Sequence, residues 1–222
     1  AGSLKLIKMK KILIAICCFS FFNVNAQESD LGNWLIYIGN KKVNEKWSIH
    51  NEIQYRNYEF AGDLEQLLLR TGVGYNLDNT TNLLLGYGYI KSENYINNSD
   101  KETVNEHRIF QQLTTKQNIG IFKISHRYRF EQRFVESNFK MRLRYFLSAQ
   151  VPLTKKTDKG LYLSAYNEIF INTKNQLFDR NRIYSGLGYR INKNIRVEAG
   201  YMNQLFLNGS RDQLNFISFI NF

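Results

Sequence analysis

The sequence predicts an all-β fold, a transmembrane antiparallel β-barrel of about ten to twelve strands that follows a cleaved signal peptide. Three observations lead to this prediction. Apolar and polar residues alternate with period two along almost the whole chain after residue 30. A short basic and apolar leader precedes them. The chain ends on an alternating run, Leu214, Phe216, Ser218, Ile220 and Phe222, and a terminal aromatic residue is typical of bacterial outer-membrane barrels.

The leader has the three parts of a secretory signal peptide. Lys8, Lys10 and Lys11 precede an apolar run over 12–22, and Val24-Asn25-Ala26 supplies the small residues of a cleavage site. This run is too short to span a bilayer as a helix. Met9 is a natural start for this signal peptide, so we expect residues 1–8 to be vector-derived or to reflect a misplaced start codon. Residues 9–26 form the expected signal peptide, and residues 27–222 form the expected barrel.

Composition narrows the class of protein. The leader holds four lysines and no acid, so its removal lowers the formal net charge from +11 to +7. It also removes Cys17 and Cys18, the only cysteines, so the mature chain offers no disulfide. No later segment is continuously apolar over the ~20 residues that a spanning helix needs. Hydropathy alone would classify the mature chain as soluble, which is the usual error for a barrel.

The period-two pattern divides the chain into eleven stretches separated by turn residues. If both ends of the chain lay in the periplasm, the strand count would be even. Either residues 32–40 then form a lumen or periplasmic segment, giving ten strands, or one long stretch hides a twelfth. The stretches are 32–40, 46–58, 64–77, 80–91, 104–116, 119–134, 139–151, 160–172, 180–192, 194–207 and 212–222.

Three patterns favour a membrane barrel over a soluble sandwich. In 119–134 and 139–151 the apolar residues occupy one face and the basic residues the other, which suits lipid outside and a polar lumen inside. Tyrosines gather toward strand ends, as interfacial girdles require. The loops alternate between tight turns, such as Asp78-Asn79, and long polar segments at 92–103 and 173–179.

The chain also carries a family resemblance, whose most specific part is the arginine-rich central hairpin formed by 119–134 and 139–151. The residues that show it are Trp34, Trp47-Ser48, Glu106-His107-Arg108, Gln111-Gln112, the run from His126 to Arg133, and Arg142-Leu143-Arg144-Tyr145. With these residues the chain resembles domain-of-unknown-function family 2490 over nearly the whole mature length. The resemblance implies an outer-membrane barrel of a type common in Bacteroidota and some proteobacteria. It implies no activity and no site, because the family has none established.

The hairpin concentrates positive charge on the lumen face. Pairing about Glu136-Ser137-Asn138 would set Arg133 opposite Lys140, Glu131 opposite Arg142, and Arg129 opposite Arg144. Like charges opposite one another destabilise a ladder, so something must offset them. The candidate basic patch is Arg127, Arg129, Arg133, Arg142 and Arg144, and the candidate counter-charges are Glu106, Glu131, Glu168 and Glu198.

Two functions fit this patch. The first is a small anion-preferring channel or ligand-binding barrel, because basic rings favour anions. The second is a closed structural or interaction barrel, in which arginines and glutamates cross-link the interior. An open path along the arginine face would favour the first, and a filled lumen would favour the second.

A membrane-embedded hydrolase is the third and weakest hypothesis, so we expect no enzyme. The mature chain has only His50, His107 and His126, and Ser125 beside His126 points to the opposite face of its strand. Three histidines on separate strands give no metal-ligand spacing, so we expect neither a metal nor a cofactor.

The expected partners follow from an outer-membrane location in a Gram-negative bacterium. Phe216, Ile220 and Phe222 form the expected signal for the barrel assembly machinery. Lipid and lipopolysaccharide are expected at the wall, with Lys91, Lys101 and Lys174 near outer phosphates. Nucleic acid is not expected, because the basic residues alternate along strands of an exported chain. A monomer is the default.

Overall fold

The computed structural model describes residues 31–222 except 98, 155–158 and 175. The predicted signal peptide lies outside the described residues. Within the part of the chain that is described, no helix is long and apolar enough to cross a membrane.

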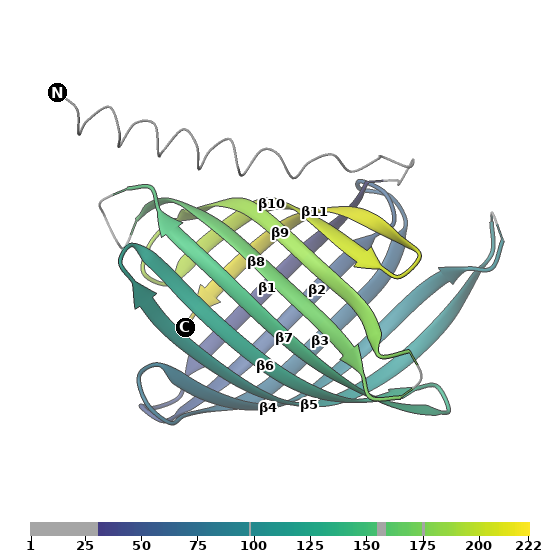
Figure 1. Ribbon diagram of the computed structural model, residues 1–222, viewed down its shortest axis with the longest axis horizontal. Coiled ribbons are helices and arrows are strands. Elements are labelled where there is room, and N and C mark those ends of the chain that lie inside the picture. Colours follow the sequence, from purple (N-terminus) through teal and green to yellow (C-terminus); the bar gives the residue numbers. More distant parts are fainter. Residues whose placement is uncertain (1–30, 98, 155–158, 175) are drawn as a thin grey trace.

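Eleven strands form the structure (Figure 1), and they follow the eleven alternating stretches of the sequence closely. The alternation of side chains across each strand is the reason, since residues i and i+2 share a face. The strands are β1 (Gly32–Lys42), β2 (Trp47–Asn57), β3 (Leu64–Asn76), β4 (Thr81–Tyr95), β5 (Lys101–Ile119), β6 (Phe122–Val135), β7 (Asn138–Pro152), β8 (Gly160–Asn172), β9 (Phe178–Arg190), β10 (Ile195–Phe206) and β11 (Gly209–Asn221).

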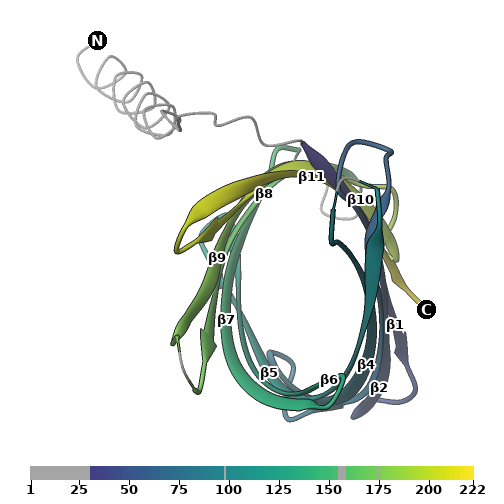
Figure 2. The same cartoon turned by 90° about the vertical axis from the view of Figure 1, so that its right-hand side faces the viewer.

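The sheet closes into a barrel with an oval ring of strands (Figure 2). Each strand pairs antiparallel with its neighbours in sequence, but β1 and β11 pair in parallel, from Gly32 opposite Gln213 to Asn40 opposite Asn221. The prediction of an antiparallel barrel was therefore wrong at this seam. The expectation of an even strand count fails for the same reason, because a parallel closing pair requires an odd number.

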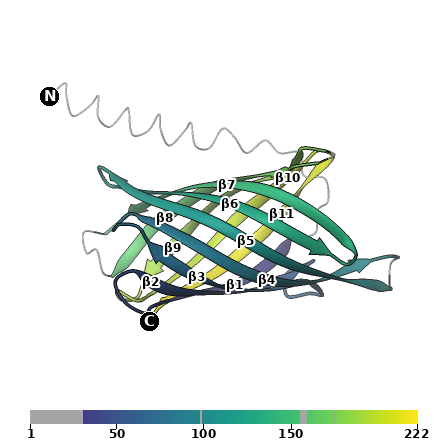
Figure 3. The ribbon, with the colours of Figure 1, turned by 90° about the horizontal axis from the view of Figure 1, so that it is seen from below.

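The parallel seam places the two ends of the described chain at opposite ends of the barrel. We call the end where β1 begins the N end and the end where β11 finishes the C end. The connections β2–β3, β4–β5, β6–β7, β8–β9 and β10–β11 lie at the N end, and the other five lie at the C end. Figure 3 shows the tilted strands running between these two ends.

The loops differ in length less than the sequence predicted. The predicted loop 92–103 is mostly strand, because the β4–β5 ladder continues out to Tyr95 opposite Lys101. This hairpin extends beyond the other connections of its end (Figures 1 and 3). The predicted loop 173–179 is also shorter, because β9 begins at Phe178. At the same end, β6–β7 and β10–β11 are joined by only two residues each.

The inside of the barrel is polar and the outside is apolar. Among the described residues, nineteen polar or charged residues are fully buried, against eleven hydrophobic ones. Conversely, thirty-nine large hydrophobic residues are exposed, most of them on the outer wall. A water-soluble barrel shows the opposite distribution, because apolar surface is normally buried away from water.

Glycines make room for large inward side chains. Gly86 lies opposite Phe110 across β4 and β5, and a Cβ atom at Gly86 would collide with the phenyl ring. Gly188 has the same relation to Tyr162. A smaller apolar cluster of Trp34, Ile36, Tyr184, Met202 and Ile217 fills the lumen beside the β1–β11 seam.

Candidate functional site

The central hairpin has the predicted register. β6 and β7 join through Glu136 and Ser137, and Arg133 lies opposite Lys140, Glu131 opposite Arg142, and Arg129 opposite Arg144. The alternation of the two strands points all six side chains into the lumen. The predicted conflict of like charges is therefore present in the ladder, and the surrounding carboxylates and amides resolve it.

Glu131 is the centre of the network and is fully buried. Its carboxylate lies 2.7 Å from Nη2 of Arg142, 2.6 Å from Nη1 of Arg144 and 3.7 Å from Nη1 of Arg129. A buried carboxylate is costly unless charged donors surround it, and here arginine forks supply them. One residue thus balances the charge on both strands of the hairpin.

Glu168 on β8 forms the second centre. Its Oε1 lies 2.8 Å from Nη2 of Arg127 and 2.7 Å from Nη2 of Arg144. Arg182 on β9 approaches Oε2 at 3.8 Å, beyond hydrogen-bond distance. Arg144 therefore bridges Glu131 and Glu168 and links three consecutive strands, β6, β7 and β8.

Glu106 on β5 is the third centre. It accepts paired hydrogen bonds from Nε and Nη2 of Arg108, at 2.5 and 2.8 Å. Arg133 donates to it in the same bidentate way, at 2.5 and 3.0 Å. This fork-to-carboxylate geometry is the reason that arginine, rather than lysine, suits such an interior.

Glu198 lies apart from the basic patch. Its Oε1 accepts a hydrogen bond from the Tyr162 hydroxyl at 2.8 Å, and Arg196 is 4.0 Å away. Of the four predicted counter-charges, Glu106, Glu131 and Glu168 join the patch and Glu198 does not. Glu52 forms another separate pair, with Arg70 at 2.9 Å.

Two carboxylates that the sequence analysis missed pair with arginines inside the barrel, and only Asp179 joins the network of the basic patch. Asp179 binds Nη1 of Arg142 at 2.6 Å, and Glu65 binds Nη1 of Arg211 at 2.6 Å. Each is left out of its ladder by a register shift, between Phe170 and Ile171 on β8 and between Arg56 and Asn57 on β2. A bulge changes the direction of a side chain, so strict alternation could not place these two acids inside.

Arg129 is the one member of the basic patch without a close carboxylate among the described residues. Its Nε and Nη2 atoms donate to Oε1 of Gln112 at 2.9 and 2.6 Å. Its guanidinium carbon lies 4.5 Å from the centre of the Phe110 ring. The amide and the ring orient Arg129 without neutralising it.

The network is buried inside the barrel. Five inward-pointing members of the network are each 7% exposed or less, namely Arg129, Arg142, Arg144, Glu131 and Glu168. Seven arginines and five glutamates are fully buried among the described residues, which leaves more positive than negative charge inside. The patch is therefore a buried network of ion pairs with an excess of arginine.

Comparison with known proteins places the chain. A family model described as a protein of unknown function, DUF2490, matches residues 31–215. The chain belongs to this family. A curated relative, an uncharacterised protein of Methylorubrum extorquens, is 28% identical over 212 residues that cover 90% of each chain. No solved structure matches. The resemblance seen in the sequence is confirmed at the level of the family, and it brings no activity with it.

The three histidines of this DUF2490 barrel do not meet in one place. His126 lies on the outer wall, where its ring contacts the Tyr145 hydroxyl at 2.9 Å. His107 contacts the Tyr87 hydroxyl at 2.6 Å, and His50 lies inside against Asn40 at 2.9 Å. No cluster of three or more His, Cys, Asp or Glu side chains suited to a metal occurs among the described residues.

The terminal strand presents its predicted signal residues outward. Phe216 is 39% exposed and Phe222 66% exposed, and the Phe222 amide donates to the Asn40 carbonyl at 2.8 Å. Ile220 lies opposite Gly39 on β1 and Ile195 on β10. The C-terminal residue is thus held against β1 at the seam.

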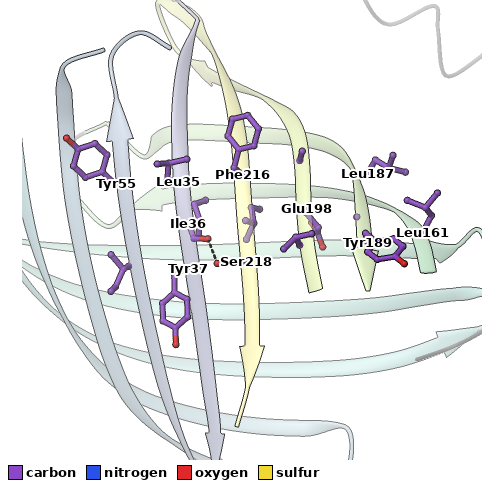
Figure 4. Close-up of a pocket in the computed structure, with 15 residues that line it drawn as sticks. Leu35, Ile36, Tyr37, Tyr55, Leu161, Leu187, Tyr189, Glu198, Phe216 and Ser218 are labelled. Atoms are coloured by element: carbon purple, nitrogen blue, oxygen red, sulfur yellow. Dashed lines mark hydrogen bonds between the residues drawn. The ribbon is translucent and has the colours of Figure 1, made fainter. Parts of the chain in front are cut away.

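Two shallow apolar hollows, of about 610 and 870 Å³, indent the outer wall. Figure 4 shows the smaller one, where Leu35, Phe216, Leu187 and Leu161 come from neighbouring strands around the β1–β11 seam. Apart from Gln111, their exposed side chains are aliphatic or aromatic, so these hollows suit acyl chains better than polar solutes.

Proposed function

We propose that this DUF2490 protein is an integral outer-membrane β-barrel whose lumen is closed by its own Arg–Glu network. It acts as a structural or interaction barrel and not as an open diffusion pore. The observation that carries this proposal is the full burial of Glu131 beneath Arg142 and Arg144, with contacts of 2.7 and 2.6 Å.

The distribution of polarity supports the membrane location. An apolar outer wall in water would be a large aggregation surface, whereas in lipid it costs nothing. Trp47 and Tyr75 contact each other on the wall near the C end, with ring centres 4.8 Å apart. Phe134 and Phe139 do so near the N end, with ring centres 5.1 Å apart. Aromatic residues at both rims match the girdles of outer-membrane barrels.

The predicted leader supports export, and the exposed aromatic residues of the β11 segment, Phe216 and Phe222, support insertion in the outer membrane. On this proposal the partners are membrane lipid, lipopolysaccharide and the barrel assembly machinery. Lys91 and Lys101 already have acidic neighbours, Glu93 at 2.6 Å and Asp63 at 2.8 Å. Contacts with outer phosphates would therefore compete with these exposed pairs.

Planar-bilayer recording of the purified, refolded protein tests the closed lumen. We expect folded protein that inserts without steady conductance. A folded sample is identified by its β-sheet circular dichroism and by a heat-dependent shift on a gel. Reproducible conductance steps from such a sample would overturn the proposal. Detergent extraction of fractionated membranes tests the location separately, and recovery from the soluble fraction would contradict it.

The surplus of buried arginine favours a second candidate function, a small channel that prefers anions. Such a channel must first break the ion pairs around Glu131 and Glu168. Glu131→Gln removes one buried negative charge and keeps the shape of the side chain. Anion-selective steps in Glu131→Gln, with a silent wild type, would show that this carboxylate holds a gate closed.

A further inference from the structure

The positive charge inside the barrel is not evenly compensated. Arg127, Arg133, Arg142 and Arg144 each have a carboxylate within 2.8 Å. Arg56 on β2 has no carboxylate within ion-pair distance among the described residues, and for Arg182 the shortest distance is 3.8 Å. Both are 7% exposed. Besides Arg129, whose nearest carboxylate oxygen is 3.7 Å away, the weakly compensated charge thus includes two residues outside the basic patch predicted from the sequence.

These two arginines lie against one indole ring. The guanidinium carbon of Arg56 is 3.7 Å from the centre of the Trp34 ring, and that of Arg182 is 4.8 Å from it. Arg56 is the direct neighbour of Trp34 across β1 and β2. Arg182 reaches the same ring from β9, which is separated from β1 by β11 and β10. The two like charges therefore lie near each other in a buried place.

Neutral amides hold both guanidinium groups in position. Arg56 donates to Gln54 at 3.0 Å and to Gln66 at 2.6 Å. Arg182 donates from Nε to Gln204 at 2.9 Å, and among the described residues its two terminal nitrogens have no hydrogen bond. Amide oxygens orient these groups but add no negative charge. A buried cation normally has a close counter-charge, whereas among the described residues Arg56 has none within ion-pair distance and Arg182 has only Glu168 at 3.8 Å.

A second observation points to the same place. Four buried polar atoms have no hydrogen-bond partner here within the described part of the chain. They are Nε1 of Trp34, Oδ1 of Asn215, and both Nε2 and Oε1 of Gln213. Trp34 lies opposite Asn215 across the β1–β11 seam, and Gln213 lies opposite Gly32 in the same ladder. Trp34, Gln213 and Asn215 are each at most 3% exposed. Buried polar atoms are nearly always satisfied, so an unpaired group of this kind calls for an explanation.

We propose that Arg56, Arg182 and Trp34 form an internal binding site for a small oxyanion, a phosphate or carboxylate group. The two guanidinium forks supply charge-assisted hydrogen bonds, and the indole N–H supplies another donor. The Gln213 amide has both polar atoms unpaired, so its NH₂ group is available to an anion. The Asn215 NH₂ group donates to Sδ of Met202 at 3.8 Å, a weak contact that an anion can replace. The site lies toward the N end, near the beginnings of β1 and β11.

This site differs from an anion filter in the Arg142–Arg144 patch. There the carboxylates of Glu131 and Glu168 already occupy the forks, so an anion would meet negative charge. At Trp34 neutral amides hold the Arg56 fork, since its Nε and Nη2 atoms donate to Gln54 and its Nη1 atom donates to Gln66. An oxyanion there replaces neutral acceptors and, among the residues that the structure describes, meets no carboxylate within hydrogen-bond distance of Arg56 or Arg182. The inference does not depend on the membrane location or on a silent lumen, because binding is measured on the folded protein in detergent.

Tryptophan fluorescence provides a direct test, because the chain has two tryptophans. Trp47 lies exposed on the outer wall, so Trp47→Phe leaves Trp34 as the only reporter. We expect inorganic phosphate, added at constant ionic strength against chloride, to change Trp34 emission saturably. Acetate in a parallel titration distinguishes a carboxylate preference from a phosphate preference. The absence of a saturable change with both anions would overturn the proposal.

Substitutions in the Trp47→Phe protein locate the response. Arg56→Gln and Arg182→Gln should each weaken apparent binding about tenfold or more, the loss expected for a charge-assisted hydrogen bond. Arg182→Lys, which keeps the charge but not the fork, should weaken it less. Arg133→Gln is the matched control, because Glu106 stays paired with Arg108. A response that survives both glutamine variants, or that Arg133→Gln removes, would overturn the assignment.

Stability in the absence of anion gives a second readout. Arg56→Gln and Arg182→Gln each relieve like-charge repulsion, so each should unfold at a higher temperature than its parent in phosphate-free chloride buffer. Each should also lose the stabilisation that phosphate gives the parent. A purely structural role predicts the reverse, with both variants less stable at every phosphate concentration, and that result would contradict an anion site.

Discussion

Arg144 and Glu131 form an ion pair of 2.6 Å along a diagonal of the β6–β7 ladder, although neither residue lies opposite the other. The residue directly opposite Arg144 is Arg129. The diagonal contact therefore resolves the like-charge conflict that direct pairing creates, because long side chains reach diagonal neighbours on one face of a sheet. Arg144 makes a second contact with Glu168 at 2.7 Å, so it joins the two main acidic centres.

The first prediction is that Arg144→Met strongly destabilises the barrel. The substitution removes the bridge between two buried carboxylates, and breaking a buried pair on one side costs about 3–5 kcal/mol. The measurement is the free energy of unfolding in guanidinium with the protein in detergent micelles. Lys140→Met is the control, because Lys140 is an exposed cation of the same strand, and a change within about 0.5 kcal/mol is expected. Equal losses for the two variants would refute the bridging role.

The sequence predicted those features of the fold that depend on period two. The strand positions, the inward face of each strand and the register of the central hairpin all follow from alternation. The parallel β1–β11 seam could not be predicted, because it depends on which edges meet at closure and not on any local pattern. Asp179 and Glu65 were missed for a related reason, since each lies at a bulge where alternation fails.

The candidate sites divide in the same way. Arg142 and Glu131 could be paired from the hairpin alone, because only two neighbouring strands are involved. The approach of Arg182 to Trp34 crosses the lumen from β9 to β1. Only the closed barrel brings these residues together, so no local pattern in the sequence predicts their contact.

The second prediction concerns the glycines that face aromatic rings. Gly86→Ala should lower stability by about 1–3 kcal/mol, because its Cβ would overlap the Phe110 ring and overpack the lumen. Gly88→Ala is the matched control on the same face, since its nearest contact would be the flexible Arg70 side chain at 3.2 Å. Thermal unfolding of both variants checks the difference. A Gly88→Ala loss as large as that of Gly86→Ala would show that strand flexibility, not ring contact, requires glycine.

The third prediction is a pH effect at the N end, outside the proposed membrane span. A hydrogen bond from Lys101, and a second from Tyr95, lower the pKa of Asp63 from its ordinary value of 3.8. These contacts tie the β4–β5 hairpin to the β2–β3 connection. Because the folded pKa is lowered, the contribution is present above the ordinary pKa and is lost as pH falls through the folded one.

A nitroxide label at Ser99→Cys should therefore become more mobile as the pH is lowered below about 4, the ordinary range of an aspartate. Asp63→Asn should be mobile at every pH, since the amide cannot form the charged contact. Electron paramagnetic resonance spectra give the mobility directly. A label whose mobility changes with pH equally in both proteins would assign the effect to another group.

The last prediction follows from the odd strand count. Because β1 and β11 run in parallel, Leu31 lies at the N end of the barrel, as does Asn208. Lys193, in the β9–β10 connection, lies at the C end. In cells, the membrane-impermeant labelling of single cysteines reports which side each position faces. Leu31→Cys and Asn208→Cys should react alike, and Lys193→Cys should react only from the other side of the membrane. An even-stranded barrel predicts the opposite grouping, with Leu31→Cys matching Lys193→Cys. That grouping would mean that β1 does not cross the membrane within the wall, and the parallel seam would then have to be replaced by a β2–β11 closure.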